Sequence, residues 1–217
     1  MYIPKHFEEP RTDVLHELMR ARPLATLITL SSDGLNANHI PLQIDALPQP
    51  FGTLRGHVAR TNPLLDGLRN DVETMAVFHG PDAYISPSWY ASKKESGKVV
   101  PTWNYVVAHA YGYVRIVDDR DWLRAQIESL TTQHEAQQQE PWAVADAPSE
   151  YIEKLLGAIV GIEIVITRLL GKWKLSQNQP HGNQTGVIAG LRAAGTSSAF
   201  EVADLVAVAA APKGLQK

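Results

Sequence analysis

The stretch SPSWYASKKESGKVVPTWNY, Ser86–Tyr105, gathers the side chains best suited to hold a ligand. Trp89 and Tyr90 precede a hydrophilic loop with three lysines, and Trp103 and Tyr105 follow it. Trp, Tyr, Asn and Thr together offer flat apolar faces beside hydrogen-bonding groups, which a planar heteroaromatic ligand needs for orientation. Trp and Tyr are also favoured in an aromatic core or a dimer interface, so composition alone leaves these interpretations open.

A second candidate is the segment LRGHVARTNP, Leu54–Pro63, which carries Arg60 at the end of a predicted strand. Asn62 followed by Pro63 is typical of a helix start, with a cap residue and then a proline in the first turn. A guanidinium beside the unpaired N–H groups at such a helix start would suit a phosphate. The alternative is that Arg60 is an ordinary surface arginine at a strand end.

Other chemistry lacks a motif in this sequence. The eight histidines show neither a HExxH pairing nor a finger-like cluster, so we expect no metal site. His39 and His57 fall on neighbouring predicted strands, where a ligand-lining role and a structural role are both open. Ser86 and Ser88 lie outside any Gly-x-Ser-x-Gly elbow, and no P-loop or Rossmann fingerprint occurs. The absence of cysteine excludes a thiolate nucleophile and disulfides.

The elements that must position these residues follow from apolar periodicity and turn residues. A helix is expected from Thr12 until Pro23 stops it. A hairpin turn is expected at Ser31–Gly34 and another turn at Gly80–Asp82. The expected strands are rich in β-forming residues and comprise Leu24–Leu30, Leu35–Asp45, Thr53–Ala59, Val72–Gly80, Ala83–Pro87 and Thr102–Val117.

The second half of the chain predicts helices around one more hairpin. Helical spacing predicts a helix over Asp121–Ala136, and Ser149 is a candidate cap for the next. IEIVITRLL and KWKLSQ are expected to pair in a hairpin around Leu170–Gly171. Closing helices are expected over Gly186–Ala194 and Ala199–Ala211. Five or six antiparallel strands with peripheral helices predict an α+β fold, mainly β, built on a barrel.

Composition sets the remaining expectations. The chain has 217 residues and is 44% hydrophobic, which predicts one domain over residues 1–217 with C-terminal helices from about 180. Its net charge of −3 argues against a general affinity for polyanions. The N-terminus lacks a signal-peptide pattern, and the most apolar stretch is short and interrupted by Glu163. We therefore expect a soluble cytoplasmic protein with no membrane association.

The motifs together resemble the PaiB-like FMN-binding negative transcriptional regulators, relatives of the pyridoxamine phosphate oxidase split barrel. The matching stretches span most of the chain in order, and SPSWY followed by VPTWNY is the most specific part. They are MYIPKHF, NHIPL, LRGHVARTNP, FHGPDAYISPSWYASK, VVPTWNY and KWKLSQN.

This resemblance implies a split β-barrel homodimer with one FMN in each of two clefts, each cleft built from both chains. It places the phosphate at Arg60 and the start of the Asn62 helix, and the ring system near the strand residues around His57. Side chains of SPSWY, TWNY and LSQN would close the cleft. The implied FMN contacts are Asn38, His39, His57, Arg60, Thr61, Asn62, Ser86, Ser88, Trp89, Lys93, Trp103, Asn104, Tyr105, Ser176 and Gln177.

Three functions follow from these observations. The first is an FMN-binding regulator, as the resemblance implies. The second is a flavin-dependent oxidoreductase, for which Tyr105 and His39 are generic candidate acids or bases. The third is a cofactor-free structural dimer whose aromatic residues form the interface. Direct DNA binding is not expected, because the charge is negative and no predicted helix pair carries a basic recognition face.

Overall fold

The computed structural model describes residues 1–69 and 71–211, and these residues fall into two compact units. Unit 1 comprises Met1–Arg11, His79–Ala108 and the described residues from Leu170 onward, and unit 2 comprises Thr12–Phe78 and His109–Leu169. A single domain over residues 1–217 stays a prediction, and residues 212–217 lie outside the described residues.

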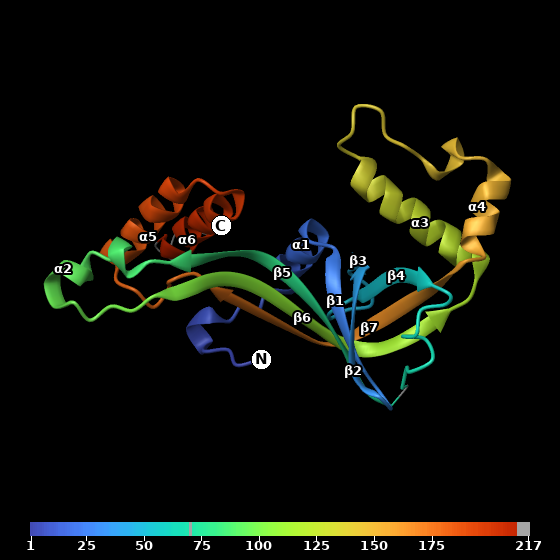
Figure 1. The fold of residues 1–217 in the computed structure, drawn as a ribbon, viewed down its shortest axis with the longest axis horizontal. Helices are drawn as coiled ribbons and strands as arrows, with labels where there is room; N and C mark the ends of the chain where they lie inside the picture. Colours follow the sequence, from blue (N-terminus) through green and yellow to red (C-terminus); the bar gives the residue numbers. More distant parts are fainter. Residues whose placement is uncertain (70, 212–217) are drawn as a thin grey trace. The chain divides into compact units, whose positions relative to one another are not determined.

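A seven-stranded sheet forms the framework, with the strand order β2-β1-β5-β6-β7-β4-β3 (Figure 1). The α+β class is confirmed, but the sheet is not closed: no pairing joins the edge strands β2 and β3 in the described chain. The strands are β1 (Leu24–Ser31), β2 (Gly34–Pro41), β3 (Gln43–Asp45), β4 (Thr53–Ala59), β5 (Thr74–Ile85), β6 (Thr102–Val117) and β7 (Ile159–Lys174).

Three helices belong to unit 2, namely α1 (Thr12–Ala21), α3 (Arg120–Glu135) and α4 (Ser149–Leu156), all close to their predicted positions. In α1, Leu15 and Met19 are four residues apart, so both face inward, and both are almost fully buried. α3 and α4 bury Leu123 and Leu156 in one apolar cluster. Unit 2 thus has a core of its own.

Unit 1 contains α2 (Ser92–Ser96), α5 (His181–Ala194) and α6 (Ser197–Ala210), and α5 and α6 lie side by side (Figure 1). Gly195 ends α5 with φ +73°, a left-handed conformation that suits glycine, and the Thr196 hydroxyl caps α6 by accepting from the N–H of Ala199. The two predicted closing helices are confirmed, although α5 begins earlier than expected.

The predicted turn at Gly80–Asp82 is wrong, because β5 runs straight through it. β1 pairs with β5 only over Met75–Val77, so the Pro81 position requires no ladder N–H toward β1. The Ser198 hydroxyl, which is distant in sequence, binds the next residue: it accepts from the N–H of Asp82 at 3.2 Å and donates to the Asp82 carbonyl at 2.6 Å. A side chain therefore satisfies both backbone groups of the residue that follows the proline.

The predicted hairpin at Leu170–Gly171 is also wrong, since β7 continues to Lys174. The N-terminal segment gives this part of β7 an extra partner: the N–H of Glu9 donates to the Gly171 carbonyl at 3.1 Å, and Glu8 bridges Lys172. This pairing spans more than a hundred residues of sequence, so local turn propensity could not reveal it.

Two smaller predictions change as well. The single strand Leu35–Asp45 divides into β2 and β3. The N–H of Leu42 still donates to the Pro23 carbonyl at 2.9 Å, in register with the β1–β2 ladder, and β3 then pairs with β4. The helix expected at Asn62 is absent. Asn62 Oδ1 accepts from the N–H of Leu64 at 2.9 Å, and only isolated turn bonds follow, such as Leu65 N–H to the Asn62 carbonyl.

Glu163 of β7 joins two arginines of neighbouring strands in unit 2. Its Oε2 accepts from Arg55 Nε at 3.1 Å, and its Oε1 accepts from Arg115 Nη2 at 2.6 Å. Burial raises the pKa of this carboxyl, but the hydrogen bonds from Arg115 and Arg55 outweigh burial and hold the pKa below its ordinary value. Arg55 also donates to Asp45 at 3.0 Å, so this network of ion pairs extends from β6 and β7 through β4 to β3.

Replacing Glu163 with Gln should lower the free energy of unfolding by about 1 kcal/mol at pH 7, because both arginines are partly exposed and keep some hydration. The folded-state pKa is depressed, so the contribution is complete above the unfolded value of 4.5 and is lost as pH falls through the folded value. Urea unfolding from pH 7 downward measures this. Glu17→Gln, an exposed change on α1, is the control, and an identical pH dependence of the two variants would contradict the assignment.

Candidate functional site

The predicted site residues of unit 2 form one small polar cluster and several separate side chains. Asn62 Nδ2 donates to Asn38 Oδ1 at 3.2 Å, and Asn38 Nδ2 donates to Asn36 Oδ1 at 2.8 Å. The structure therefore brings Asn38 and Asn62 together. His39 is exposed on the edge strand β2, and Thr61 is exposed after β4. These groups can offer amide and hydroxyl contacts to a polar ligand.

Arg60 is bound within the chain instead of being free for an anion. Its two terminal nitrogens donate to both carboxylate oxygens of Asp118, at 2.8 and 2.6 Å. The remaining bonds run to the carbonyls of Gly157 and Ile159. Hydrogen bonding to Asp118 raises the pKa of Arg60, and the same bond lowers the pKa of Asp118. A phosphate would have to displace this carboxylate, and the helix expected to begin at Asn62 is absent.

His57 faces α3 and is held by it. His57 Nδ1 lies 2.7 Å from Gln126 Oε1, which makes one hydrogen bond between β4 and α3. Gln126 is almost fully buried, and in the described chain its Nε2 has no hydrogen-bond partner. The pair orients the imidazole, so His57 takes part in the packing of unit 2.

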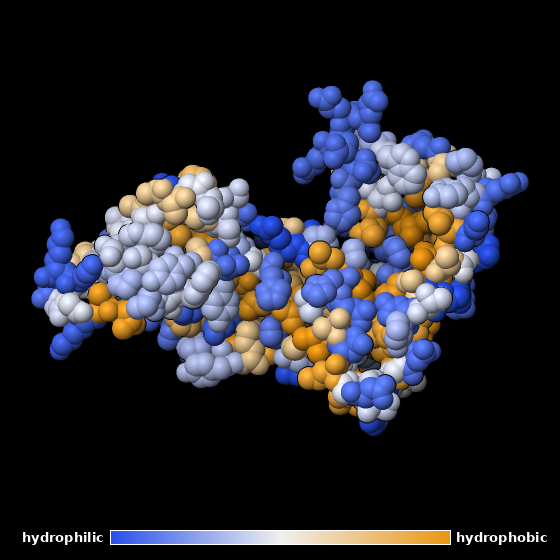
Figure 2. Space-filling view, in the orientation of Figure 1, coloured by the Kyte–Doolittle hydropathy of each residue, from blue (hydrophilic) through white to orange (hydrophobic). Residues whose placement is uncertain are grey.

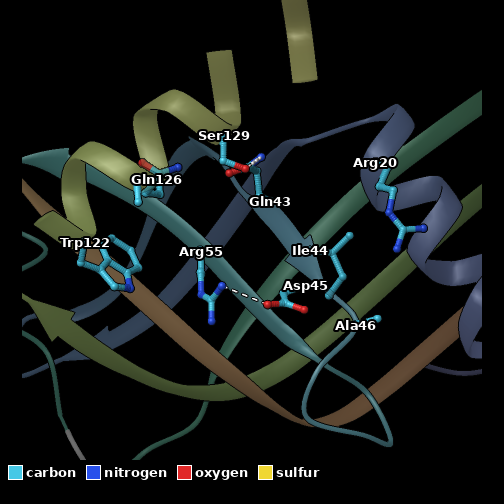
Figure 3. A pocket seen from close by; sticks show the side chains of 10 residues that line it. Arg20, Gln43, Ile44, Asp45, Ala46, Arg55, Trp122, Gln126 and Ser129 are labelled. Carbon is cyan, nitrogen blue, oxygen red and sulfur yellow. Dashed lines mark hydrogen bonds and ion pairs between the residues drawn. The ribbon is translucent and has the colours of Figure 1, made fainter. Parts of the chain in front are cut away.

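A cavity of about 640 Å³ lies beside this pair, between α1, β3, β4 and α3 (Figure 3). Trp122 and Gln126 line it from α3, Arg20 from α1, and Arg55 with Asp45 from the strands. Figure 3 shows Arg55 directed toward Asp45, which matches their ion pair. None of the predicted site residues lines this cavity.

The first predicted residues of unit 1 shape the segment after β5. Ser86 Oγ accepts from the N–H of Ser88 at 3.2 Å and caps a short turn of 3-10 helix, Pro87–Trp89. Lys93 Nζ donates to Ser88 Oγ at 3.2 Å. Ser88 thus joins the other two residues through its backbone N–H and its hydroxyl, and Ser88 and Lys93 are exposed while Ser86 is partly buried.

Trp89 packs closely against α5 at two glycines, Gly186 and Gly190. A Cβ at Gly190 would lie 2.2 Å from the Trp89 ring, and one at Gly186 would lie 1.9 Å from the Trp89 carbonyl. Only residues without a side chain permit this approach. Part of the aromatic stretch that suggested a ligand site is therefore a packing contact of unit 1.

The other aromatic residues lie more openly on β5 and β6. Trp103 is 54% exposed and meets Tyr84, 48% exposed, edge to face at 6.0 Å between ring centroids. Tyr105 is half-buried. Trp103 and Tyr84 thus keep free apolar faces, which a flat ligand could use.

Asn104, Ser176 and Gln177 meet at the end of β7. The Asn104 amide donates to Ser176 Oγ at 2.9 Å, and both residues are buried. Ser176 has φ 63°, an uncommon conformation for a residue with a side chain. Gln177 secures the bend by accepting from the N–H of Leu175 at 2.7 Å and donating to the Trp173 carbonyl at 2.6 Å. This polar group fixes the turn after β7.

Two lysines that the sequence analysis did not select lie next to this group. Lys172 Nζ is 5.2 Å from the Tyr105 ring centroid, and Lys174 Nζ donates to the Trp103 carbonyl at 2.8 Å. The spacing in KWK is the signal, because alternate strand residues share a face. The sequence analysis missed this signal because the expected hairpin at Gly171 placed the two lysines at the start of a separate strand.

Comparison with known proteins identifies the family. The family model described as "Putative FMN-binding domain" matches residues 1–168. An uncharacterized protein of Emericella nidulans is 37% identical over 242 residues, covering 95% of this chain and 96% of that protein. Protease synthase and sporulation protein PAI 2 of Bacillus subtilis is 28% identical over 206 residues, again covering 95% and 96%.

Solved structures agree on the fold. The FAD and heme binding protein from Mycobacterium smegmatis has a TM-score of 0.58 at 16% identity, with 77% of this chain and 73% of that chain covered. The flavocytochrome Anf3 from Azotobacter vinelandii has a TM-score of 0.59 at 10% identity, with 79% and 72% covered. The predicted flavin-binding split-barrel fold is confirmed. The chain therefore belongs to the FMN-binding domain family, resembles its PaiB-like members, and has FMN as its cofactor.

Proposed function

We propose that this chain is an FMN-binding regulator of transcription that works as a homodimer and does not bind DNA directly. The observation that carries the proposal is similarity over 95% of the chain to the PAI 2 protein of Bacillus subtilis, together with the FMN-binding family match. Regulation would then follow from the redox or ligand state of the flavin, or from a protein partner.

The residues present suit FMN. Within unit 1, Trp103 offers an exposed ring face of the kind that a flat cofactor uses. Within unit 2, Asn38 and Asn62 offer amide groups for polar contacts. The other residues implied by the family resemblance stay proposed contacts. Bound FMN would supply hydride or electron transfer, while the protein would orient it and set its electrostatic surroundings.

Homodimer formation is supported by apolar side chains exposed on the strands of unit 2. Leu30 and Leu35 pair across β1 and β2, and they are 40% and 79% exposed. Leu24 on β1, Tyr113 on β6 and Val165 on β7 are exposed as well. Figure 2 shows hydrophobic residues gathered over the strands of this unit. An exposed edge strand with apolar residues is a common place for a second copy to pair.

The helices argue against direct DNA readout. α5 and α6 are adjacent in sequence and in contact, yet α6 contains no Lys or Arg and carries Glu201 and Asp204. A recognition helix needs basic or amide side chains that reach base edges and phosphates.

In the described chain, no helix has the length and apolar character to cross a membrane.

Titration of purified protein with FMN should show saturable binding, because the family and the exposed ring of Trp103 both favour a flavin. Quenching of flavin fluorescence measures it, followed by absorption spectra under anaerobic NADH or NADPH to detect reduction. Trp103→Ala should weaken FMN binding by roughly 0.5–1.5 kcal/mol, the usual value of an aromatic contact. Trp142→Ala, which changes another exposed tryptophan, is the control. The absence of saturable binding by wild-type protein would contradict the proposal.

Leu35→Glu should convert a dimer into a monomer, because a charge would then lie on the exposed apolar pair of β1 and β2. Light scattering after size exclusion measures the mass, with about 24 kDa expected for the variant from the chain mass of 23.9 kDa. Leu47→Glu places the same charge at another exposed leucine, outside the strands, and should stay dimeric. A wild-type monomer would reject the homodimer.

Mobility-shift assays at about 150 mM salt with competitor DNA should show no specific complex. With few basic contacts, affinity from counterion release is weak at this salt concentration. A footprint that survives these conditions would restore direct repression as the mechanism.

A further inference from the structure

Two ammonium groups lie on one face of β7 in unit 1, and among the described residues neither has an acidic partner. Lys172 and Lys174 are separated by one residue, so their side chains leave the same side of the strand. In the part of the chain that the structure describes, no carboxylate oxygen lies within the 4.0 Å ion-pair distance of either Nζ. The N-terminal segment that pairs with this part of β7 carries two acidic residues, Glu8 and Glu9. Neither neutralises the lysines, because Glu9 forms an ion pair with Arg11 and Glu8 is exposed.

Both lysines are withdrawn from water. Lys172 is only 9% exposed, and its Nζ donates to the Tyr2 carbonyl at 3.1 Å. Lys174 is half-buried and donates to the Thr102 hydroxyl and the Trp103 carbonyl. Burial lowers the pKa of Lys174, and the charge of Lys172 lowers it further. Burying a charge without an opposite one is costly, so proteins normally pair such groups.

The surroundings favour a phosphate attached to a flat molecule. The rings of Tyr105 and Tyr2 lie 5.2 and 5.9 Å from Lys172 Nζ. Trp103 of the exposed pair Trp103–Tyr84 lies on β6, the neighbour of β7, and Tyr84 lies on β5, the next strand. Two neighbouring cations match the double charge of a phosphate group and form charge-assisted hydrogen bonds with it.

We propose that Lys172 and Lys174 bind a phosphate group, carried either by FMN itself or by a separate phosphorylated ligand. The FMN source rests on the proposed function, whereas the phosphate site does not. The pair differs from Arg60, whose guanidinium already holds Asp118 and two backbone carbonyls. A phosphate completes the lysine pair but must displace a carboxylate at Arg60.

The site is tested first with inorganic phosphate at constant ionic strength, using thermal unfolding of the full chain. Phosphate should raise the Tm of wild type and leave the Tm of Lys172→Met/Lys174→Met unchanged. Without phosphate, the double variant should be at least as stable as wild type, because it lacks one buried and one half-buried charge that have no carboxylate partner in the described chain. Lys94→Met/Lys98→Met removes the same charge from exposed positions of unit 1 and should respond like wild type.

Two results would overturn the proposal. The first is an equal response of wild type and Lys172→Met/Lys174→Met to phosphate. The second is a double variant that is less stable than wild type without phosphate, which would assign the lysines a structural role through Tyr2, Thr102 and Trp103. Lys172→Arg/Lys174→Arg, which keeps both charges, should retain part of the response.

Comparing FMN with riboflavin then identifies the source of the phosphate. If FMN carries it, the Met variant should lose at least tenfold in FMN affinity with riboflavin affinity unchanged, and Lys94→Met/Lys98→Met should keep the wild-type FMN affinity. If phosphate stabilisation is lost while FMN affinity is kept, the ligand is a separate phosphorylated molecule, and the site stands. Wild-type protein that responds to phosphate but binds no flavin would reject the proposed function alone.

Discussion

Continuous pairing along two long strands is the constraint on which the other features depend. β6 and β7 are sixteen residues each and are neighbours in the sheet, and each contributes residues to both compact units. Because their ladders cannot be interrupted without leaving backbone groups unpaired, the chain stays extended through Gly171, where local composition predicts a turn. The positions of Glu163 and of the two lysines of β7 follow from this register.

The charges of the protein divide into compensated and uncompensated sets. Arg55 and Arg115 share Glu163, and Arg60 is held by Asp118, so these arginines serve the packing of unit 2. Lys172 and Lys174 have no such acid in the described chain. In a protein with a net charge of −3, two withdrawn cations without a carboxylate are a reason to expect a ligand and not a structural pair.

The aromatic residues divide in a similar way. Trp89 is committed to the glycine face of α5, which explains its presence without any cofactor. Trp103 and Tyr84 stay open on their strands and keep the faces that a flavin could use. The polar residues Asn104 and Ser176 bond to each other, so their contribution to a ligand site is the shape of the turn after β7. The stretch Ser86–Tyr105 thus contributes a packing residue in Trp89, an exposed ring in Trp103 and a turn-shaping amide in Asn104.

The sequence by itself determined the α+β class, the helices and most strand positions, because apolar periodicity and caps act over a few residues. It also indicated the flavin family, because each motif from MYIPKHF to KWKLSQN is an unbroken stretch of sequence that can be recognised without the fold. Only the tertiary structure decided that Gly80–Asp82 and Leu170–Gly171 lie within strands, since their partners, Ser198 and Glu9, are distant in sequence. The same holds for Arg60 and the two lysines: whether a cation is free depends on which carboxylates fold beside it, and no local pattern carries that information.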